Sequence, residues 1–138
     1  MLALTQGDPA GIAPEITVKA WRILRENKLP FVFVGDPTLL EQHAPVQAVR
    51  YLEQGSDIFS HAIPVLPLRL ATPASPGEPD RQNASSVVDS IRLAVELAQN
   101  VEASAIITNP ISKEVIQSAG FEHPGHTSYL AELCHVPG

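Results

Sequence analysis

The sequence predicts an α/β fold built on a largely parallel sheet. Short apolar runs alternate with amphipathic helical segments along the chain. Two of the runs, 31–34 and 105–107, are apolar at every position, which is typical of strands covered on both faces. Both are followed by a turn that contains Asp-Pro or Asn-Pro. This order of strands, turns and helices predicts helices packed on both faces of a parallel sheet.

The first unit is a strand, a glycine-containing turn and a helix. Residues 2–5 form an apolar run that ends in the turn 6–11. A helix is expected next, because Pro14 suits a first helical turn, and it should end before Pro30, which disfavours helical geometry in the preceding residue. Its predicted apolar face consists of Ile16, Ala20, Ile23 and Leu24, and Trp21 is expected to be core or half-buried.

The middle of the chain carries weaker patterns. Residues 31–34 predict a buried strand and 38–43 a short helix. Further strands are expected within 46–52 and 63–68, and the proline-rich segment 71–80 predicts a loop. Proline lacks the N–H that a strand donates, so pairing of these strands is limited by the prolines at 45, 64 and 67.

The clearest helical pattern covers residues 83–100. Asn83 or Ser85 is expected to cap its N-terminus, and a buried strand over 104–108 should follow. The apolar stripe of the helix contains Val87, Ile91, Ala94, Val95 and Ala98.

The last part of the chain predicts two more helices. Ser112 suits the N-cap of a helix over 113–119, which Gly120 would end in a left-handed conformation. A loop over 121–126 then leads to a helix that begins near Thr127.

Composition and charge narrow the class of protein. The chain has 138 residues, 44% of them hydrophobic, and a net charge of −6, which suits one domain with a core. The acidic balance argues against nucleic-acid and membrane-surface partners, since both require clustered Lys and Arg. One cysteine, Cys134, excludes an intrachain disulfide and fits a reducing compartment. Without a secretory signal pattern or a membrane-length apolar run, we expect a cytoplasmic protein.

Three strand-to-helix junctions carry the chemically interesting residues. In the first, Gln6–Ile12, backbone N–H groups are expected to face an anion, and Asp8 places a carboxylate at the end of a strand. The alternative is a turn that needs its glycines only for backbone conformation. The glycine spacing matches neither the dinucleotide-binding fingerprint nor a Walker A loop.

The second and third junctions contribute a lysine and a histidine. Lys113 follows Thr108–Ser112 and suits a phosphate or carboxylate partner, although a solvated lysine is the simpler interpretation. In the third junction, His126 and Thr127 offer an imidazole and a hydroxyl, the alternative being a histidine bonded to backbone. A metal site on His123 and His126 is not expected, because Pro124-Gly125 breaks the helical register. His43 and His61 are expected at the surface.

Together these segments resemble one enzyme family. Thr5-Gln6-Gly7-Asp8-Pro9-Ala10-Gly11-Ile12, Ile107-Thr108-Asn109-Pro110-Ile111-Ser112-Lys113 and His123-Pro124-Gly125-His126-Thr127 occur in the order and at the spacing of 4-hydroxythreonine-4-phosphate dehydrogenases, the PdxA family. The resemblance covers essentially the whole chain. It implies a fold like that of isocitrate and isopropylmalate dehydrogenases, with an α/β/α sandwich, two domains and a homodimer. Residues 1–138 are then expected to be the N-terminal α/β portion, inactive alone.

The resemblance also implies a reaction and its cofactors. Family members oxidise 4-phosphooxy-L-threonine with NAD or NADP, and the keto acid loses carbon dioxide to give 3-amino-2-oxopropyl phosphate in pyridoxal phosphate biosynthesis. A divalent metal (Zn, Mg or Co) holds the substrate oxygens, and its ligands are expected outside residues 1–138. No metal ligand is therefore expected among these residues, and most contacts to the nucleotide and the substrate are expected outside them, with the residues that contact the nucleotide left unassigned.

The site residues are carried over by motif. His126 and Thr127 match the Gly-His-Thr motif, whose His and Thr contact the substrate, whereas Asp8 and Lys113 match recurrent positions without an assigned role. Ser128 departs from the family, which has Glu directly after this motif. That departure motivates a second hypothesis, the same fold acting on phospho-threonate or phospho-erythronate. A third hypothesis is a non-catalytic anion-binding module.

Overall fold

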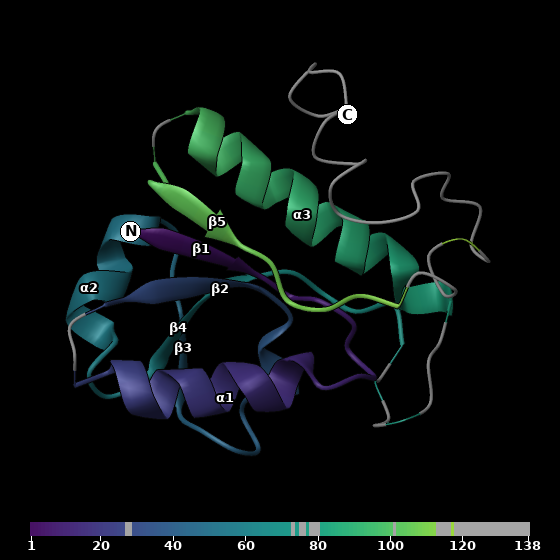
Figure 1. Ribbon diagram of the computed structural model, residues 1–138, viewed down its shortest axis with the longest axis horizontal. Coiled ribbons are helices and arrows are strands. Elements are labelled where there is room, and N and C mark those ends of the chain that lie inside the picture. Colours follow the sequence, from purple (N-terminus) through teal and green to yellow (C-terminus); the bar gives the residue numbers. More distant parts are fainter. Residues whose placement is uncertain are drawn as a thin grey trace.

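The fold is a parallel sheet with helices on both faces. A computed structural model describes residues 1–26, 29–72, 74, 77, 81–100, 102–112 and 117. The sheet has five strands in the order β3-β4-β2-β1-β5, and every neighbouring pair is parallel (Figure 1). The predicted α/β class with a parallel sheet is confirmed.

Strands and helices alternate along the chain. The strands are β1 (Leu2–Thr5), β2 (Phe31–Gly35), β3 (Val46–Ala48), β4 (Ile63–Pro67) and β5 (Ala105–Ile107). The α-helices are α1 (Ala13–Leu24), α2 (Gly55–Ile58) and α3 (Ala84–Gln99). Three short 3-10 turns complete the described elements: η1 (Pro37–Leu39), η2 (Leu52–Gln54) and η3 (Arg81–Asn83).

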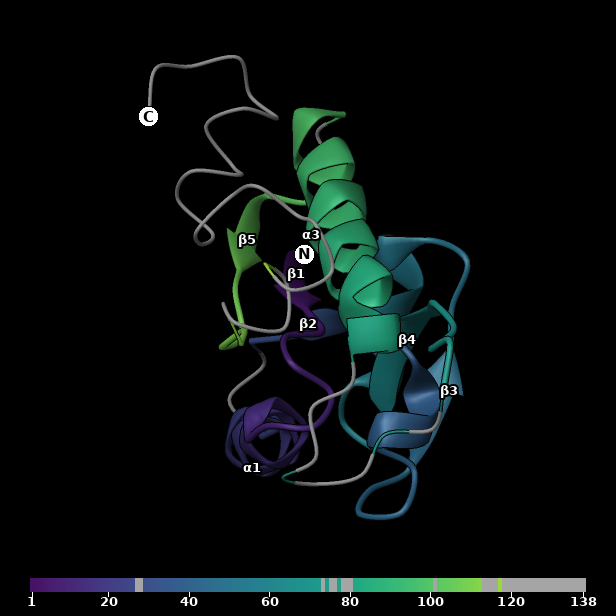
Figure 2. The same ribbon diagram turned by 90° about the vertical axis from the view of Figure 1, so that its right-hand side faces the viewer.

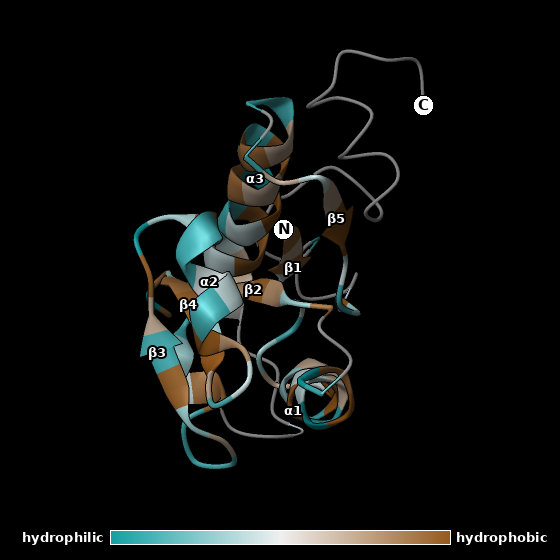
Figure 3. Cartoon of the chain, turned by 90° about the vertical axis from the view of Figure 1, so that its left-hand side faces the viewer, coloured by the Kyte–Doolittle hydropathy of each residue, from teal (hydrophilic) through white to brown (hydrophobic). Residues whose placement is uncertain are grey.

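The core consists of two apolar layers, one on each face of the sheet. Successive side chains of β2 point to opposite faces, so Phe31 and Phe33 pack against α1 while Val32 and Val34 pack against the face covered by α2 and α3. Figures 1 and 2 show α1 and α3 on opposite sides of the sheet. The hydropathy colouring of Figure 3 places the hydrophobic residues on the strands between these helices. All five residues of β2 are buried, as the unbroken apolar run predicts.

The sheet-facing side of α1 differs from the predicted one. Ile16 and Ile23 are 41% and 67% exposed, whereas Thr17 and Trp21 are buried. Two hydrogen bonds set this orientation: Trp21 Nε1 donates to the Phe59 carbonyl at 2.8 Å, and Thr17 Oγ1 accepts a hydrogen bond from the loop after β5. The predicted face was wrong for Ile16 and Ile23, but Ala20 and Leu24 pack against the core beside the buried Trp21. Trp21 itself is buried, as predicted.

Two prolines lie in β4, an interior strand, without breaking the sheet. Pairing with β2 runs only from Val65 to Pro67, so Pro64 lies before it. Pairing with β3 ends at Val65, so Pro67 lies after it. The N–H of Ile63 donates toward β3, and the N–H of Leu68 donates to β2. Because successive nitrogens of a strand point to opposite sides, the nitrogen of each proline faces a neighbouring strand at a position where the two strands are not paired. The prolines therefore restrict the pairing without placing the strand at an edge.

Other elements are shorter than predicted or placed differently. The strand expected over 46–52 ends at Ala48 and is followed by η2 and α2, and the helix expected over 38–43 is the single turn η1. The strand near 104–108 is β5, an edge strand whose Ile107 is 44% exposed, so its predicted burial was wrong.

Helix α3 agrees closely with its pattern. Val87, Ile91, Ala94 and Val95 of the predicted stripe are buried. Asn83 occupies the N-cap position, but its Oδ1 accepts a hydrogen bond from Thr72 N and makes no cap within the helix. Among the described residues, none of the helices has the length and hydropathy needed to span a bilayer.

Candidate functional site

The carboxyl edge of the sheet is the candidate site. In a parallel sheet all strands end at the same edge, and ligands of open α/β folds bind there. The loop after β1 (6–12) and the loop after β5 (108–112) meet at this edge. Asp8 N donates to the Pro110 carbonyl at 2.8 Å, which joins the two loops directly. The structure therefore brings together the first two of the three junctions that the sequence singled out.

Gly7 allows the two loops to approach each other. Its φ is +70°, a conformation that L-residues with side chains disfavour. A Cβ at this position would lie 2.6 Å from Asn109 Cβ, 2.7 Å from the Pro110 carbonyl oxygen and 2.8 Å from Ala13 Cβ. Glycine at position 7 is thus required by both backbone conformation and space.

Asn109 joins three elements at this edge. Its backbone N donates to Thr5 Oγ1 at 3.0 Å, and its Nδ2 donates to the Thr5 carbonyl at 2.8 Å and to Thr17 Oγ1 at 3.0 Å. Thr17 Oγ1 in turn donates to the Ala13 carbonyl at 2.8 Å. All the side chains involved are buried. Asn109 therefore holds the loop after β5 against the end of β1 and the first turns of α1.

Three N–H groups of the loop after β1, where the sequence suggested an anion site, are bonded within the protein. The N–H of Asp8 is taken by Pro110, that of Ala10 by Asp8 Oδ1 at 3.0 Å, and that of Gly11 by the Asp8 carbonyl at 3.2 Å. All three donors are therefore used within the protein, and the bond from Ala10 N to Asp8 Oδ1 forms an Asx turn. The predicted anion site at these groups is therefore wrong.

Gln6 connects the end of β1 to β2 and α3. Its side chain is fully buried, Oε1 accepts a hydrogen bond from Asp36 N at 3.0 Å, and Nε2 donates to Ser86 Oγ at 3.1 Å. Its backbone N donates to Ser90 Oγ at 2.9 Å, and this hydroxyl donates to the Val34 carbonyl at 2.5 Å. The network fixes where the loop after β1 leaves the sheet.

Two carboxylates lie at the ends of neighbouring strands and differ in their surroundings. Asp36, after β2, is 7% exposed; its Oδ1 accepts from Thr38 N and Oγ1, and its Oδ2 accepts from Leu70 N at 2.8 Å. Asp8, after β1, is partly buried, and the described residues supply a hydrogen bond to Oδ1 alone. Both oxygens of Asp36 are bonded within the protein, which indicates a structural role. Asp8 has a second oxygen, Oδ2, at the carboxyl edge of the sheet with no hydrogen bond from the described residues.

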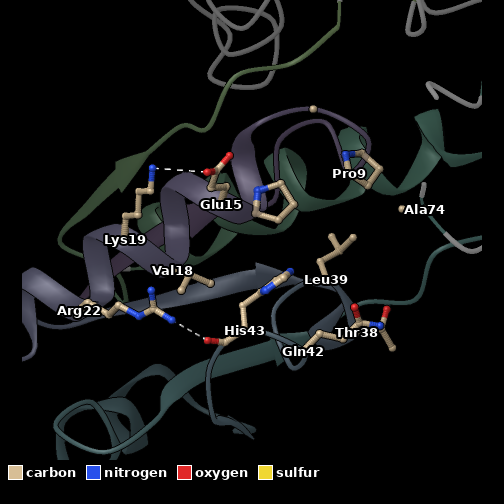
Figure 4. A pocket seen from close by; sticks show the side chains of 12 residues that line it. Pro9, Glu15, Val18, Lys19, Arg22, Thr38, Leu39, Gln42, His43 and Ala74 are labelled. Atoms are coloured by element: carbon tan, nitrogen blue, oxygen red, sulfur yellow. Dashed lines mark hydrogen bonds and ion pairs between the residues drawn. The ribbon is translucent and has the colours of Figure 1, made fainter. Parts of the chain in front are cut away.

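A pocket of about 490 Å³ opens beside this loop. It runs from Pro9 and Gly11 along α1, with Leu39 and His43 on the opposite wall (Figure 4). Such a volume lies within the range of small-molecule sites. Its cations are already engaged: Lys19 lies 3.4 Å from Glu15, and Arg22 Nη2 donates to the His43 carbonyl at 2.9 Å. A ligand held at the loop has room to extend into this pocket.

The remaining site predictions fall partly outside the described residues. His126, Thr127, Ser128 and Lys113 all lie outside them, as do the helices expected over 113–119 and from Thr127. His43 and His61 are exposed, as predicted. In the part of the chain that the structure describes, no group of three or more His, Cys, Asp or Glu side chains is placed to hold a metal ion.

Sequence reasoning missed the two residues that organise the edge. Gln6 and Asn109 lie in the first and second strand-to-helix junctions, but the sequence pattern assigned a role to neither. The available signal was position: each is a polar side chain within two residues of the end of an apolar strand, where a buried amide can bond to neighbouring loops.

Comparisons with known proteins identify relatives of this chain. A profile of the family described as "Pyridoxal phosphate biosynthetic protein PdxA" matches residues 26–138. The 4-hydroxythreonine-4-phosphate dehydrogenase of Methylorubrum populi is 46% identical over 99% of this chain and 42% of the relative. The crystal structure of that enzyme from Klebsiella pneumoniae matches with a TM-score of 0.86 at 32% identity, over 98% of this chain and 44% of that one.

A more distant solved structure has a different substrate in its name. The terephthalate 1,2-cis-dihydrodiol dehydrogenase of Burkholderia xenovorans LB400 is 25% identical with a TM-score of 0.75, over 99% of this chain and 41% of that one. The chain thus spans less than half the length of the relatives and structures that it matches. By the extent of the profile match and the agreement in fold, the chain belongs to the PdxA family of pyridoxal phosphate biosynthetic proteins.

Proposed function

We propose that this chain is part of an enzyme that oxidises 4-phosphooxy-L-threonine with NAD or NADP. The secondary alcohol loses a hydride to the nicotinamide and a proton to the medium, and the resulting β-keto acid releases carbon dioxide to give 3-amino-2-oxopropyl phosphate. The observation that carries the proposal is the 46% identity, over 99% of this chain, to a protein named 4-hydroxythreonine-4-phosphate dehydrogenase. The product would enter pyridoxal phosphate biosynthesis.

The described residues have a positioning role in this proposal. Gln6 and Asn109 hold the loop after β1 at the carboxyl edge, where the pocket beside α1 begins. Pre-organised loops reduce the entropy lost when a ligand binds. We therefore expect the loop and its two amide anchors to determine how a ligand is held at this edge, with His126 and Thr127 as further substrate contacts.

Neither a metal ion nor the phosphates of a dinucleotide can be placed on the residues that the structure describes at this edge. They include no group of three metal-ligating side chains, and three N–H groups of the loop after β1 are already bonded within the protein. The described residues therefore do not fit a metal, and these three N–H groups do not fit a dinucleotide phosphate, so we derive no step through either group. A divalent metal and the dinucleotide remain part of the proposed reaction, as do a homodimer and a cytoplasmic location.

The test of this function is turnover by the full-length gene product. The purified protein is incubated with 4-phosphooxy-L-threonine, a divalent metal and either NAD or NADP, and dinucleotide reduction is followed by absorbance. Release of carbon dioxide in proportion to reduced dinucleotide is the expected result. A folded protein that reduces neither dinucleotide contradicts the proposal and favours the non-catalytic module.

A second candidate is the same oxidation of a related phosphorylated four-carbon acid, phospho-threonate or phospho-erythronate. One observation favours it: Ser128 replaces the Glu of the family motif. Initial rates with the amino acid and with each acid as competing substrates decide between them. A preference for 4-phosphooxy-L-threonine removes the second candidate.

A further inference from the structure

We propose that Asp8 contacts the ligand and accepts a hydrogen bond from one of its donor groups, a hydroxyl or an ammonium, through Oδ2. The inference deepens the proposed function and rests on it, because the proposed substrate and dinucleotide both carry such donors. It assigns a role in recognition to a residue at the carboxyl edge.

The position of Asp8 is fixed by its own backbone and by one carboxylate oxygen. Its N–H donates to the Pro110 carbonyl at 2.8 Å, its carbonyl accepts from Gly11 N at 3.2 Å, and Oδ1 accepts from Ala10 N at 3.0 Å. A side chain anchored in this way loses little conformational entropy when a ligand binds to its remaining oxygen. Asp8 is therefore pre-organised for a contact at Oδ2.

The second carboxylate oxygen, Oδ2, differs from Oδ1 in its surroundings. Within the described ranges, no hydrogen bond or ion pair reaches Oδ2 of Asp8. A Cβ built on Gly11 would lie 3.5 Å from this oxygen, so glycine at position 11 leaves that side of the carboxylate uncovered. At Asp36, the carboxylate after the neighbouring strand, both oxygens accept hydrogen bonds from the protein. Asp36 therefore has a structural role, whereas Asp8 has a carboxylate oxygen that can accept a hydrogen bond from a ligand.

The donors and acceptors that remain available in the loop determine which chemical groups can bind there. The N–H groups of Asp8, Ala10 and Gly11 are consumed within the protein, and the open group is an acceptor. A phosphate or carboxylate placed against Oδ2 would meet an acceptor of like charge, which is unfavourable. A hydroxyl or ammonium instead forms a charge-assisted hydrogen bond. The phosphate of a bound ligand must therefore lie away from Asp8.

The test compares the full-length gene product with its Asp8→Asn variant. Asparagine keeps an oxygen for the Ala10 N–H but presents an NH₂ group where Oδ2 was, so the turn is preserved and the acceptor is lost. Dissociation constants for 4-phosphooxy-L-threonine, for its analogue without the amino group, and for NAD and NADP are measured by calorimetry. Asp57→Asn, at an exposed aspartate on α2, is the control.

We expect the substrate or the dinucleotide to bind Asp8→Asn roughly tenfold to a hundredfold more weakly, as loss of a hydrogen bond to a charged group implies. If the substrate ammonium is the donor, removing the amino group weakens binding to the original protein but not to the variant. If a dinucleotide hydroxyl is the donor, the dissociation constant of NAD or NADP changes instead. Asp57→Asn should change neither constant.

A second variant covers the oxygen without altering the aspartate. Gly11→Ala places a methyl group in ordinary contact with Oδ2 and should weaken the same ligand. If both variants fold and their dissociation constants are unchanged, the inference about Asp8 is overturned, but the proposed function is not. The proposed function is tested separately, by turnover of the original protein. An original protein that binds none of these compounds contradicts both.

Discussion

Asn109 and Thr17 are 92 positions apart in the chain, yet Asn109 Nδ2 lies 3.0 Å from Thr17 Oγ1 in a buried setting. The same Nδ2 donates to the Thr5 carbonyl at 2.8 Å, so one amide group links β1, α1 and the loop after β5. This link sets the rotation of α1 and, through Pro110, the position of the loop that carries Asp8. The geometry of the candidate site therefore depends on a few buried polar contacts.

Asn109→Ala should lower the free energy of unfolding by about 2 kcal/mol, because it leaves the buried Thr5 carbonyl without its donor. Urea denaturation of the chain measures the change. Asn100→Ala, at an exposed asparagine that ends α3, should stay within about 0.5 kcal/mol of the original protein. Equal stability of the two variants would show that the Asn109 bonds contribute nothing net.

Gly7→Ala should destabilise the chain by about 3 kcal/mol, the sum of a left-handed backbone and a clash with three atoms. Gly77 is the matched control, since its φ is +77° but a Cβ there would meet nothing within 4 Å. Gly77→Ala should therefore cost only the conformational part, about 1 kcal/mol. Thermal or urea unfolding of both variants separates the two contributions. A Gly7→Ala cost no larger than that of Gly77→Ala would mean that the loops can move apart freely.

Gln6→Leu should cost about 2 kcal/mol, because the Asp36 N–H loses its acceptor inside the protein. The exchange of that amide hydrogen with deuterium should become faster, which localises the effect to the end of β2. Gln47→Leu, at an exposed glutamine of β3, serves as the control and should leave both stability and Asp36 exchange unchanged. Slow exchange retained in Gln6→Leu would contradict the assigned hydrogen bond.

Trp21 is the only tryptophan and is buried, so its fluorescence reports directly on the docking of α1. Trp21→Phe removes the hydrogen bond to the Phe59 carbonyl and part of the ring volume, and should cost about 2 to 3 kcal/mol by circular dichroism. Arg25→Ala removes a cation stacked 5.0 Å from the same ring and should cost about 1 kcal/mol or less. A larger loss from Arg25→Ala than from Trp21→Phe would contradict this order of contributions.

The sequence predicts which loop forms the candidate site, but it does not predict which atoms of that loop are available to a ligand. The position of 6–12 after an apolar strand predicts a loop at the carboxyl edge, and the structure confirms it. The anion-binding role was wrong for three of its N–H groups, because Pro110, a residue of a distant loop, takes one donor and Asp8 takes two. Lys113, His126 and Thr127 lie outside the described residues, so their roles stay predictions.

The chain pattern by itself determined the strand over 31–34, the helix over 83–100 and the parallel α/β class, because an unbroken apolar run and a 3.6-residue stripe are local properties. Only the tertiary structure decided that Thr17, and not Ile16, faces the sheet, and that Asp8, unlike Asp36, has a carboxylate oxygen with no hydrogen-bond partner among the described residues. These outcomes depend on hydrogen bonds between residues far apart in the chain. The free-energy cost of burying a polar group depends on the hydrogen-bond partner that it finds in the folded structure, and a local sequence pattern does not specify that partner.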